Sequence, residues 1–529
     1  MSHWIVAPII LPAFTAAFLV MALRHDLARQ RIVSFGATAL LLAVAVGLFA
    51  LAGDGAVRPY LLGNWPAPFG IVLVLDRLSA LMLLLTAFLA LAVLVYACEG
   101  WDAKGRHFHP LFQFQLMGLC GAFLTGDAFN LFVFFEVMLI ASYGLMLHGG
   151  GAPRLKAGFQ YVAINLVGST LFLFAVGLIY ATTGTLNMAD IALKAPQVAA
   201  GDVALLRTGA LLLLLVFALK AALVPLHWWL PTTYAAAPAP VAALFAIMTK
   251  VGAYSIIRIH AMVFGPEAGE LANAAEPWIV PAALLTLAVG AIGVVATRRL
   301  LDLVAFAAVW SMGSLLVAVG LFGPRGLTAA LYYTVHSTIA TAGLFLLADM
   351  VMRHRGQLAD RLSSAAPVAQ AALVSGLFFL AAIAMAGLPP LSGFIGKLLI
   401  LDAAREAPSA AWVWSLVLAT SLVVIIGFSR AGSVLFWKTE AAGAGPLPAG
   451  SAAPGPAAAG APRWPASAVL AVAVLIGGTG ALTLFAGPAT ATFEATAAQV
   501  LDVRGYVAAV LGPEAAAQLG GAPGVALGR

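Results

Sequence analysis

The chain has 529 residues, of which 63% are hydrophobic and only 9% are charged, and its formal net charge is +6. Soluble domains are about 45–50% apolar and about 25% charged, so this composition excludes a soluble globular protein, a disordered chain and a nucleic-acid binder. The two cysteines, Cys98 and Cys120, are too few for a disulfide framework or a metal-binding cage. We expect both to be packing residues, because a free cysteine is buried like a small hydrophobic residue.

Long apolar stretches predict an all-α membrane protein with about fourteen transmembrane helices, since each helix needs about 20 mainly apolar residues. In chain order, the expected spans are residues 4–23, 31–52, 78–97, 110–126, 129–148, 158–182, 204–230, 238–263, 276–297, 300–322, 326–352, 367–401, 411–437 and 465–487. No lysine or arginine precedes the first span and Arg24 follows it, which is the reverse of the charge pattern of a cleaved signal peptide.

The basic residues orient these spans, because lysine and arginine are enriched in cytoplasmic loops. With the N-terminus outside, the cytoplasmic loops carry fifteen lysines and arginines, the external segments carry eight, and four lie within spans. The external loop with Glu267, Glu270 and Glu276 has no basic residue, which agrees with this orientation. The sequence therefore predicts a multi-pass protein of the cell (inner) membrane with both termini extracytoplasmic.

The order of the spans divides the chain into segments. Residues 441–463 contain only alanine, glycine and proline apart from one serine, one leucine and one arginine, which is typical of a flexible linker. In the tail, residues 493–511 predict a helix that lies on the surface. The expected segments are three transmembrane helices in 1–109, a five-helix unit in 110–263, a second in 275–437, a cytoplasmic linker in 438–464, a last transmembrane helix in 465–487 and an extracytoplasmic tail in 488–529.

Charged side chains in the middle of four spans are the strongest functional signal. A charge at the centre of a bilayer costs about 2.5–3.5 kcal/mol on insertion scales, so it persists where it is paired, faces water or serves a function. Glu136 is flanked closely by apolar residues. It is either a neutral, hydrogen-bonded residue that joins helices or, as we favour, a proton-exchanging carboxylate paired with a lysine.

Two of the buried lysines lie beside prolines that interrupt their helices. Lys220 follows a long apolar run and precedes Pro225, and Lys397 follows Pro389 and Pro390. Proline removes a backbone donor, and a broken helix within a membrane is tolerated only where protein or water satisfies the freed groups. Broken helices in corresponding halves are typical of transporters built from inverted repeats. We therefore predict two inverted five-helix repeats, each with a broken helix.

Other polar residues within the spans extend this pattern. Lys250 lies in the middle of its span, and His336 lies beside Ser337 and Thr338. Imidazole exchanges protons near neutral pH, so we favour a relay role for His336 over a packing role. His227, two residues after Pro225, is a weaker candidate at the cytoplasmic entrance. Together, Glu136, Lys220, Lys250, His336 and Lys397 predict a polar row along the membrane plane.

Three further charged residues have simpler explanations. We expect Arg258 to extend to the outer membrane interface, because it lies two helical turns beyond Lys250. Asp302 and Asp349 lie near span ends, where we expect them to contact the interface.

Four sequence runs resemble one known group of membrane proteins. These runs, residues 126–143, 69–82, 181–192 and 498–511, are similar to the antiporter-like subunits of complex I and of Mrp-type cation/proton antiporters. Within that group they are most similar to the D-type subunit of Mrp antiporters. The resemblance covers nearly the whole chain. It implies fourteen helices, two inverted five-helix repeats and a central row of charged residues that matches Glu136, Lys220, Lys250, His336 and Lys397.

Three details refine the resemblance. The middle pumping subunit of complex I usually has glutamate where this chain has Lys397, and the A-type subunit of Mrp complexes is much longer than this chain. Many relatives carry a lysine four residues after the histidine, whereas this chain has Ala340. In place of that lysine, Thr341 or water is a candidate for passing protons between the two halves.

The resemblance implies a proton-translocating subunit of a multi-subunit Na⁺ or K⁺/H⁺ antiporter, with the other Mrp subunits and membrane lipid as partners. The alternatives are a proton-pumping subunit of a redox-driven complex, such as complex I or a membrane-bound hydrogenase, and a membrane scaffold without transport. The chain has no soluble nucleotide-binding domain, cysteine cluster or phosphate-binding loop. We therefore expect no cofactor, no bound metal, no nucleic-acid partner and no enzymatic activity.

Overall fold

The computed structural model describes residues 3–365, 368, 370–438 and 464–519 as a bundle of long helices. The N-terminal helices are α1 (Ala7–Ala22), α2 (Leu27–Ala52) and α3 (Arg77–Ala97). The next unit contains α4 (Phe108–Leu124), α5 (Ala128–Met146), α6 (Ala152–Thr183), α7 (Met188–Lys194), α8 (Val203–Lys220), α9 (Trp229–Ala236) and α10 (Ala239–Ile256).

The second half of the chain continues the bundle. It contains α11 (Glu276–Ala296), α12 (Leu300–Gly320), α13 (Pro324–His354), α14 (Ala371–Ala386), α15 (Ser392–Ala403) and α16 (Ala410–Gly432). After the linker come α17 (Ala466–Leu484), α18 (Ala486–Leu501), α19 (Val503–Leu511) and α20 (Pro513–Gln518). Short 3₁₀ or π segments are η1 (His3–Ile5), η2 (Leu62–Asn64), η3 (Asp102–Lys104), η4 (Ala195–Gln197), η5 (Ile257–Val263), η6 (Gly269–Leu271), η7 (Gly356–Leu358) and η8 (Ser433–Trp437).

The expected helical membrane architecture is confirmed. Within the described residues, eleven helices are long and apolar enough to cross a membrane. The three other expected spans correspond to the shorter helices α1, α4 and α14, so the total of fourteen remains a prediction. Nearly all of the expected linker, residues 438–464, lies outside the described residues.

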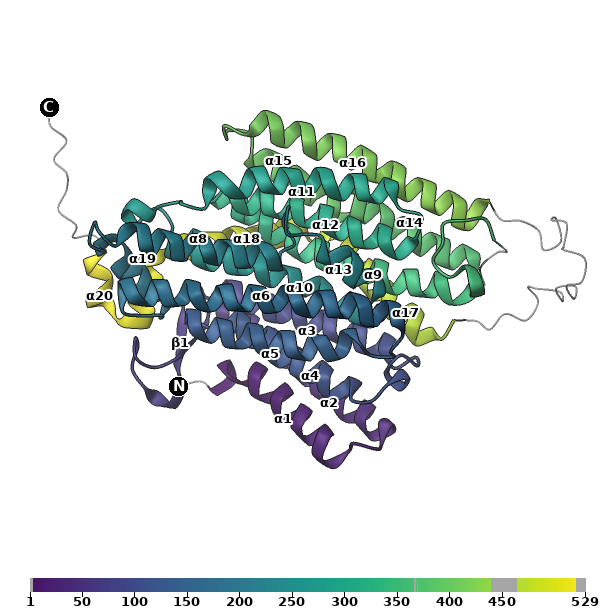
Figure 1. The fold of residues 1–529 in the computed structure, drawn as a ribbon, viewed down its shortest axis with the longest axis horizontal. Coiled ribbons are helices and arrows are strands. Elements are labelled where there is room, and N and C mark those ends of the chain that lie inside the picture. The colour runs from purple at the N-terminus through teal and green to yellow at the C-terminus, as the bar shows by residue number, and fades with distance from the viewer. Residues whose placement is uncertain (1–2, 366–367, 369, 439–463, 520–529) are drawn as a thin grey trace, which may run out of the picture.

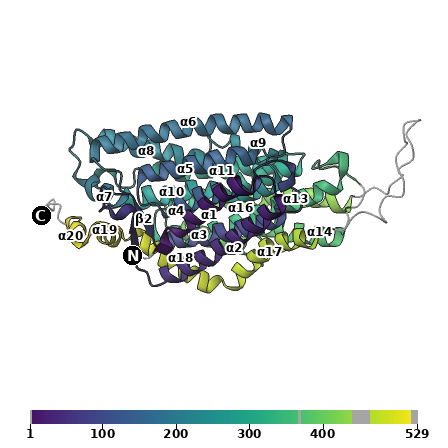
Figure 2. The ribbon, with the colours of Figure 1, turned by 90° about the horizontal axis from the view of Figure 1, so that it is seen from below.

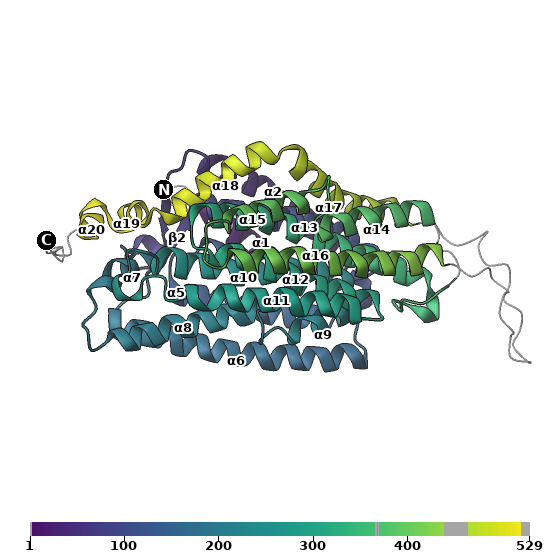
Figure 3. The ribbon, with the colours of Figure 1, turned by 90° about the horizontal axis from the view of Figure 1, so that it is seen from above.

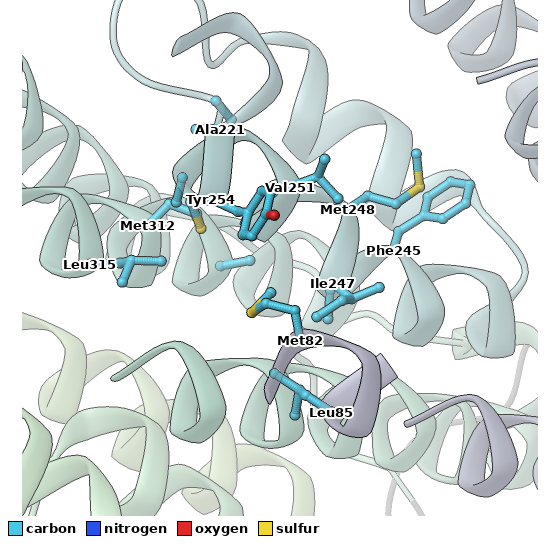
Figure 4. Close-up of a cluster of buried hydrophobic side chains, with 14 of the residues drawn as sticks. Met82, Leu85, Ala221, Phe245, Ile247, Met248, Val251, Tyr254, Met312 and Leu315 are labelled. Atoms are coloured by element: carbon cyan, nitrogen blue, oxygen red, sulfur yellow. The ribbon is translucent and has the colours of Figure 1, made fainter. Parts of the chain in front are cut away.

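The helices lie side by side along the longest axis of the molecule, with α1 and α2 at one edge and α15 and α16 at the other (Figure 1). In the two turned views, α6 lies on one face and α17 and α18 lie on the opposite face (Figures 2 and 3). Helices α10, α12 and α13 form the centre, and every residue of α10 is buried. Figure 4 shows how α10 packs there against Met82 and Leu85 of α3 and against Met312 and Leu315 of α12.

Two features outside the spans differ from the sequence expectations. An antiparallel hairpin of β1 (Arg58–Leu61) and β2 (Val72–Leu75), with Arg58 paired to Leu75, was not predicted from the sequence. The expected helix over residues 493–511 is present as α18 and α19, which meet at Asp502. Its apolar face is buried, with Phe493, Tyr506 and Val507 against the rest of the bundle, so these helices close one side of the core.

The expectation for Arg258 is wrong. Its side chain is buried and forms an ion pair with Asp76, with both guanidinium NH groups 2.6 Å from the carboxylate oxygens, while Nε donates to the Tyr254 hydroxyl at 2.9 Å. Asp76 also caps α3 by accepting from the Ser79 backbone NH. Arg258 was expected to extend to water at the interface. Instead, the Asp76 carboxylate, from a distant part of the sequence, compensates its charge inside the protein.

The expectation for Asp349 is also wrong, whereas Asp302 is partly exposed. The Asp349 carboxylate is fully buried and accepts hydrogen bonds at 2.8 Å from the Tyr96 hydroxyl and the Trp101 indole. Arg353 lies one helical turn away, with its Nε 2.8 Å from the same carboxylate. All three donors reach Oδ2, whereas Oδ1 is buried with no hydrogen-bond partner among the described residues. The three contacts tie α13 to α3 and to the loop that follows it.

We predict that Asp76→Asn destabilises the protein. Asparagine keeps the helix cap, but the Arg258 guanidinium is left buried without a counter-charge, which costs about 3–5 kcal/mol. Thermal unfolding of the solubilised protein should show a clearly lower melting temperature. Arg325→Gln, in an exposed ion pair with Glu406, is the matched control and should leave the melting temperature nearly unchanged. Equal melting temperatures for Asp76→Asn and the unmodified protein would contradict this role.

Candidate functional site

Both predicted helix breaks are present. Helix α8 ends at Lys220 and α9 begins at Trp229, so the intervening residues contain Pro225. Helix α14 ends at Ala386 and α15 begins at Ser392, on either side of the two expected prolines. Each break frees the carbonyl groups at the C-terminal end of a half-helix, where the helix dipole places partial negative charge.

Both lysines lie near such an end. Lys220 is the last residue of α8, whereas Lys397 lies on α15 and donates a hydrogen bond back to the carbonyl of Ala386, the last residue of α14. The two lysines therefore occupy equivalent places, although one precedes its proline and the other follows it. Partial negative charge at the end of α14 stabilises the Lys397 ammonium group.

The surroundings of Lys397 hold its ammonium group on several sides. It donates to the Ser421 hydroxyl at 2.8 Å and lies 4.0 Å from the centre of the Trp310 ring. Gly387 has a φ of +75°, and a Cβ there would lie 2.7 Å from the lysine nitrogen, so glycine fits both the turn and the close contact. A cavity of about 280 Å³ with mainly apolar walls lies against the same lysine.

Glu136 and Lys220 form the corresponding group in the first half. The Ser169 hydroxyl donates to the Glu136 carboxylate, and Lys220 donates to the Asn165 side chain over a long 3.5 Å. The two charges are close enough to interact electrostatically, although no direct ion pair joins them in the described part of the chain. A cavity of about 10 Å³ between Asn165, Ser169 and Lys220 has room for about one water molecule.

Lys250 and His336 bring α10 and α13 together with the Lys397 group. The His336 Nδ1 lies 2.9 Å from the Ser392 hydroxyl at the start of α15, and its Nε2 is buried with no hydrogen-bond partner among the residues that the structure describes. Lys250 and Lys397 both interact electrostatically with His336. Lys250 is 2% exposed, and no hydrogen bond of its ammonium group is found within the described ranges.

The two groups meet where α10 packs against the end of α8. A Cβ on Gly252 would lie 2.7 Å from the backbone nitrogen of Ala221, so only glycine allows this approach. Figure 4 shows Ala221 beside Val251 of α10. Lys220 and Lys250 are close neighbours of these contact residues along the chain. The structure therefore places the five predicted residues in two polar groups on contacting helices.

His227 stands apart from these groups. It lies half-buried in the segment between α8 and α9, and its Nδ1 has no side-chain partner in the described part of the protein. The uncharged partners of the charged residues were not predicted from the sequence; they are Asn165, Ser169, Ser392 and Ser421. One signal was available, because Asn165 and Ser169 lie four residues apart in a mainly apolar stretch of α6 and so share one face.

A second cluster lies outside the spans, near the end of α3. The Cys98 sulfur, an Asp102 carboxylate oxygen and a His109 ring nitrogen lie within 4.8 Å of one another. Arg31 already binds both carboxylate oxygens, at 2.6 and 2.8 Å. Burial opposes ionisation of this carboxyl, but hydrogen bonds with His109 and Arg31 outweigh it and lower the pKa of Asp102 to about 2. The cluster therefore links α2, α3 and α4 through a permanent charge pair.

Comparisons with known proteins agree with this geometry. A family model described as "NADH:quinone oxidoreductase/Mrp antiporter, TM" matches residues 125–425, which include all six candidate residues. The chain is 41% identical to the D-type subunit of a probable K⁺/H⁺ antiporter of Rhizobium meliloti (strain 1021), over 95% of this chain and 96% of that protein. It is 35% identical to the D-type subunit of a Na⁺/H⁺ antiporter of Bacillus subtilis (strain 168), over 83% of this chain and 88% of that protein.

A solved structure is similar as well. A chain in the structure of the Mrp complex from Dietzia sp. DQ12-45-1b superposes with a TM-score of 0.84 and is 31% identical. The match covers 97% of this chain and 100% of that chain. The similarity therefore includes the N-terminal helices and the C-terminal helices as well as the segment matched by the family model.

We predict that Gly393→Ala disrupts the contact between α15 and His336. The added methyl group would lie 2.9 Å from the His336 Nε2 and collide with the Ala384 carbonyl, and such overpacking costs about 1–3 kcal/mol. The melting temperature of the solubilised protein should therefore fall. Gly376→Ala in α14 is the matched control, because nothing lies within 4 Å of its added methyl group. The packing account fails if both variants melt at the same temperature.

Proposed function

Because the chain belongs to the NADH:quinone oxidoreductase/Mrp antiporter family, we propose that it is the proton-translocating subunit of a multi-subunit Na⁺ or K⁺/H⁺ antiporter. The names of its relatives and the similarity to a chain of an Mrp complex support this function. The observation that carries the proposal is the presence of four buried titratable side chains and the half-buried Glu136 in an apolar bundle, beside two broken helices.

The buried groups provide a physical means of coupling. Burial disfavours the charged form of a side chain, so each group depends on the charge of its neighbour. When Lys220 releases a proton, the negative charge of Glu136 loses a compensating positive charge. A change of charge at Glu136 or Lys220 then favours a change of charge at the next group, from Lys250 to His336 and Lys397. Protons pass between neighbours that lie within hydrogen-bond reach, directly or through water.

The broken helices place the lysines within this row. The carbonyl group of Ala386 at the end of α14 accepts a hydrogen bond from the Lys397 ammonium group and stabilises it without a full negative charge beside it. A lysine held in this way is able to lose its proton, whereas a lysine in a tight ion pair is not. We further propose that residues 110–263 and 275–437 are inverted repeats, which the equivalent positions of Lys220 and Lys397 support.

The assembly follows from the same family membership. Other Mrp subunits would be its partners, and proton entry through this chain would drive cation export through the complex. The chain would then be part of a transporter and not an enzyme, placed in the inner membrane with both termini outside. Proton pumping in a redox-driven complex is the second candidate, since the family description includes NADH:quinone oxidoreductase. Neighbouring genes for iron–sulfur or flavin subunits would favour that candidate.

We predict that Glu136→Gln abolishes exchange. Glutamine accepts the hydrogen bond from Ser169 but cannot exchange a proton, so the rate should fall by about 100-fold or more. The measurement is the change in internal pH after addition of NaCl or KCl to inverted membrane vesicles that contain the whole antiporter. The amount of assembled complex should stay the same, because the side chain keeps its shape and its partner.

Glu494→Gln is the matched control, because this carboxylate is exposed on α18. Exchange should be unchanged in that variant. Normal cation-driven pH changes with Glu136→Gln, in vesicles with an equal amount of complex, would exclude the proposed proton path.

A further inference from the structure

A buried tyrosine beside His336 lacks a well-placed hydrogen-bond partner. The side chain of Tyr333 is fully buried on α13, one turn before His336, and its hydroxyl has no partner with hydrogen-bond geometry among the described residues. The two rings lie 5.4 Å apart between centroids and are inclined by 59°. The neighbouring Tyr332 differs, because its hydroxyl donates to the Leu482 carbonyl at 3.1 Å.

The Tyr333 hydroxyl lies among other small polar groups. Ser311 and Ser314 of α12 are close enough to interact with it, and the Ser311 hydroxyl is itself buried without a well-placed partner in the described part of the chain. We call Tyr333, Ser311 and Ser314 the Tyr333 cluster. The His336 ring, 5.4 Å from the Tyr333 ring between centroids, carries another buried atom without a partner within the described ranges, Nε2.

The Tyr333 cluster also borders the Lys397 group. A Cβ on Gly396 would lie 2.9 Å from the Tyr333 ring, so the ring packs directly on the residue before Lys397. On α12, Ser311 follows Trp310, whose ring lies under the Lys397 ammonium group at 4.0 Å. The cluster therefore lies where α12, α13 and α15 meet, in contact with the helices that carry His336 and Lys397.

Unpartnered polar atoms gathered in one buried region indicate internal water. A buried polar group without a partner is costly, and folded proteins satisfy nearly all such groups with protein or ordered water. A buried water molecule typically makes about three hydrogen bonds, which matches the donors and acceptors available here. A hydroxyl both donates and accepts. It can therefore accept a proton on one side while releasing its own on the other, with one O–H bond formed as the other breaks.

We propose that the Tyr333 hydroxyl, with water held by Ser311 and Ser314, is a further proton-relay group between His336 and Lys397. This inference rests on the proposed proton path and adds a neutral member to it. The tyrosine starts and ends each transfer uncharged, so it needs no counter-charge in its apolar surroundings.

The test is Tyr333→Phe in the complete antiporter, with Tyr332→Phe as the matched control. In inverted membrane vesicles, Tyr333→Phe should lower the maximal cation-driven proton flux by about tenfold or more, because the relay atom is lost. The cation concentration that gives half the maximal flux should not change. The melting temperature should not fall, since no well-formed hydrogen bond is removed. Tyr332→Phe should keep the full flux.

Full flux in Tyr333→Phe would overturn the proposal, and so would an equal loss in both variants, because that would indicate an effect of packing. If Tyr333→Phe does not assemble, Ser311→Ala carries the same expectation, and normal flux there overturns it. Glu136→Gln separates this inference from the proposed function. Failure of the relay alone leaves Glu136→Gln inactive and Tyr333→Phe active, whereas failure of the whole path leaves both active.

Discussion

The free-energy cost of burying lysine ammonium groups away from water is the constraint on which the rest of this structure depends. Lys220, Lys250 and Lys397 are each at most 6% exposed, and none forms an ion pair within the described residues. Such groups are stable only where dipoles, water or distant charges compensate for lost hydration. The end of α14 provides such a dipole for Lys397, and the aromatic face of Trp310 adds to this.

The helix breaks and the lysines consequently depend on each other. A broken helix inside a membrane leaves carbonyl groups without donors, and the protein must satisfy them. At α14 the donor is Lys397 itself, and Gly387 leaves the space that its side chain needs. Two other glycines also allow helices to pack closely. Gly252 of α10 contacts the end of α8, and Gly393 of α15 contacts His336. The polar groups are thus held by tight packing between helices that are otherwise apolar.

The sequence predicted the features that depend on neighbouring residues along the chain. Apolar stretches indicated the helices, and prolines near Lys220 and Lys397 indicated the breaks. The sequence does not show contacts between residues that are far apart along the chain. Arg258 and Asp349 were therefore expected at the interface, although Asp76 binds Arg258 and Tyr96 binds Asp349 inside the protein. The same reason explains why Ser392 was not linked to His336. Near Ala340, the Thr341 hydroxyl has no partner among the described residues, and it stays a predicted substitute for the lysine that many relatives carry there.

The central claim is that the half-buried Glu136 and the four buried groups are connected for proton transfer. The most direct test is a structure of the whole assembly at a resolution that shows ordered water. The account predicts water beside Lys220 in the cavity lined by Asn165 and Ser169, and an unbroken chain of hydrogen bonds from there through Lys250 to His336. Dry, closely packed apolar side chains between Lys220 and Lys250, with no water within hydrogen-bond distance of either amine, would contradict it.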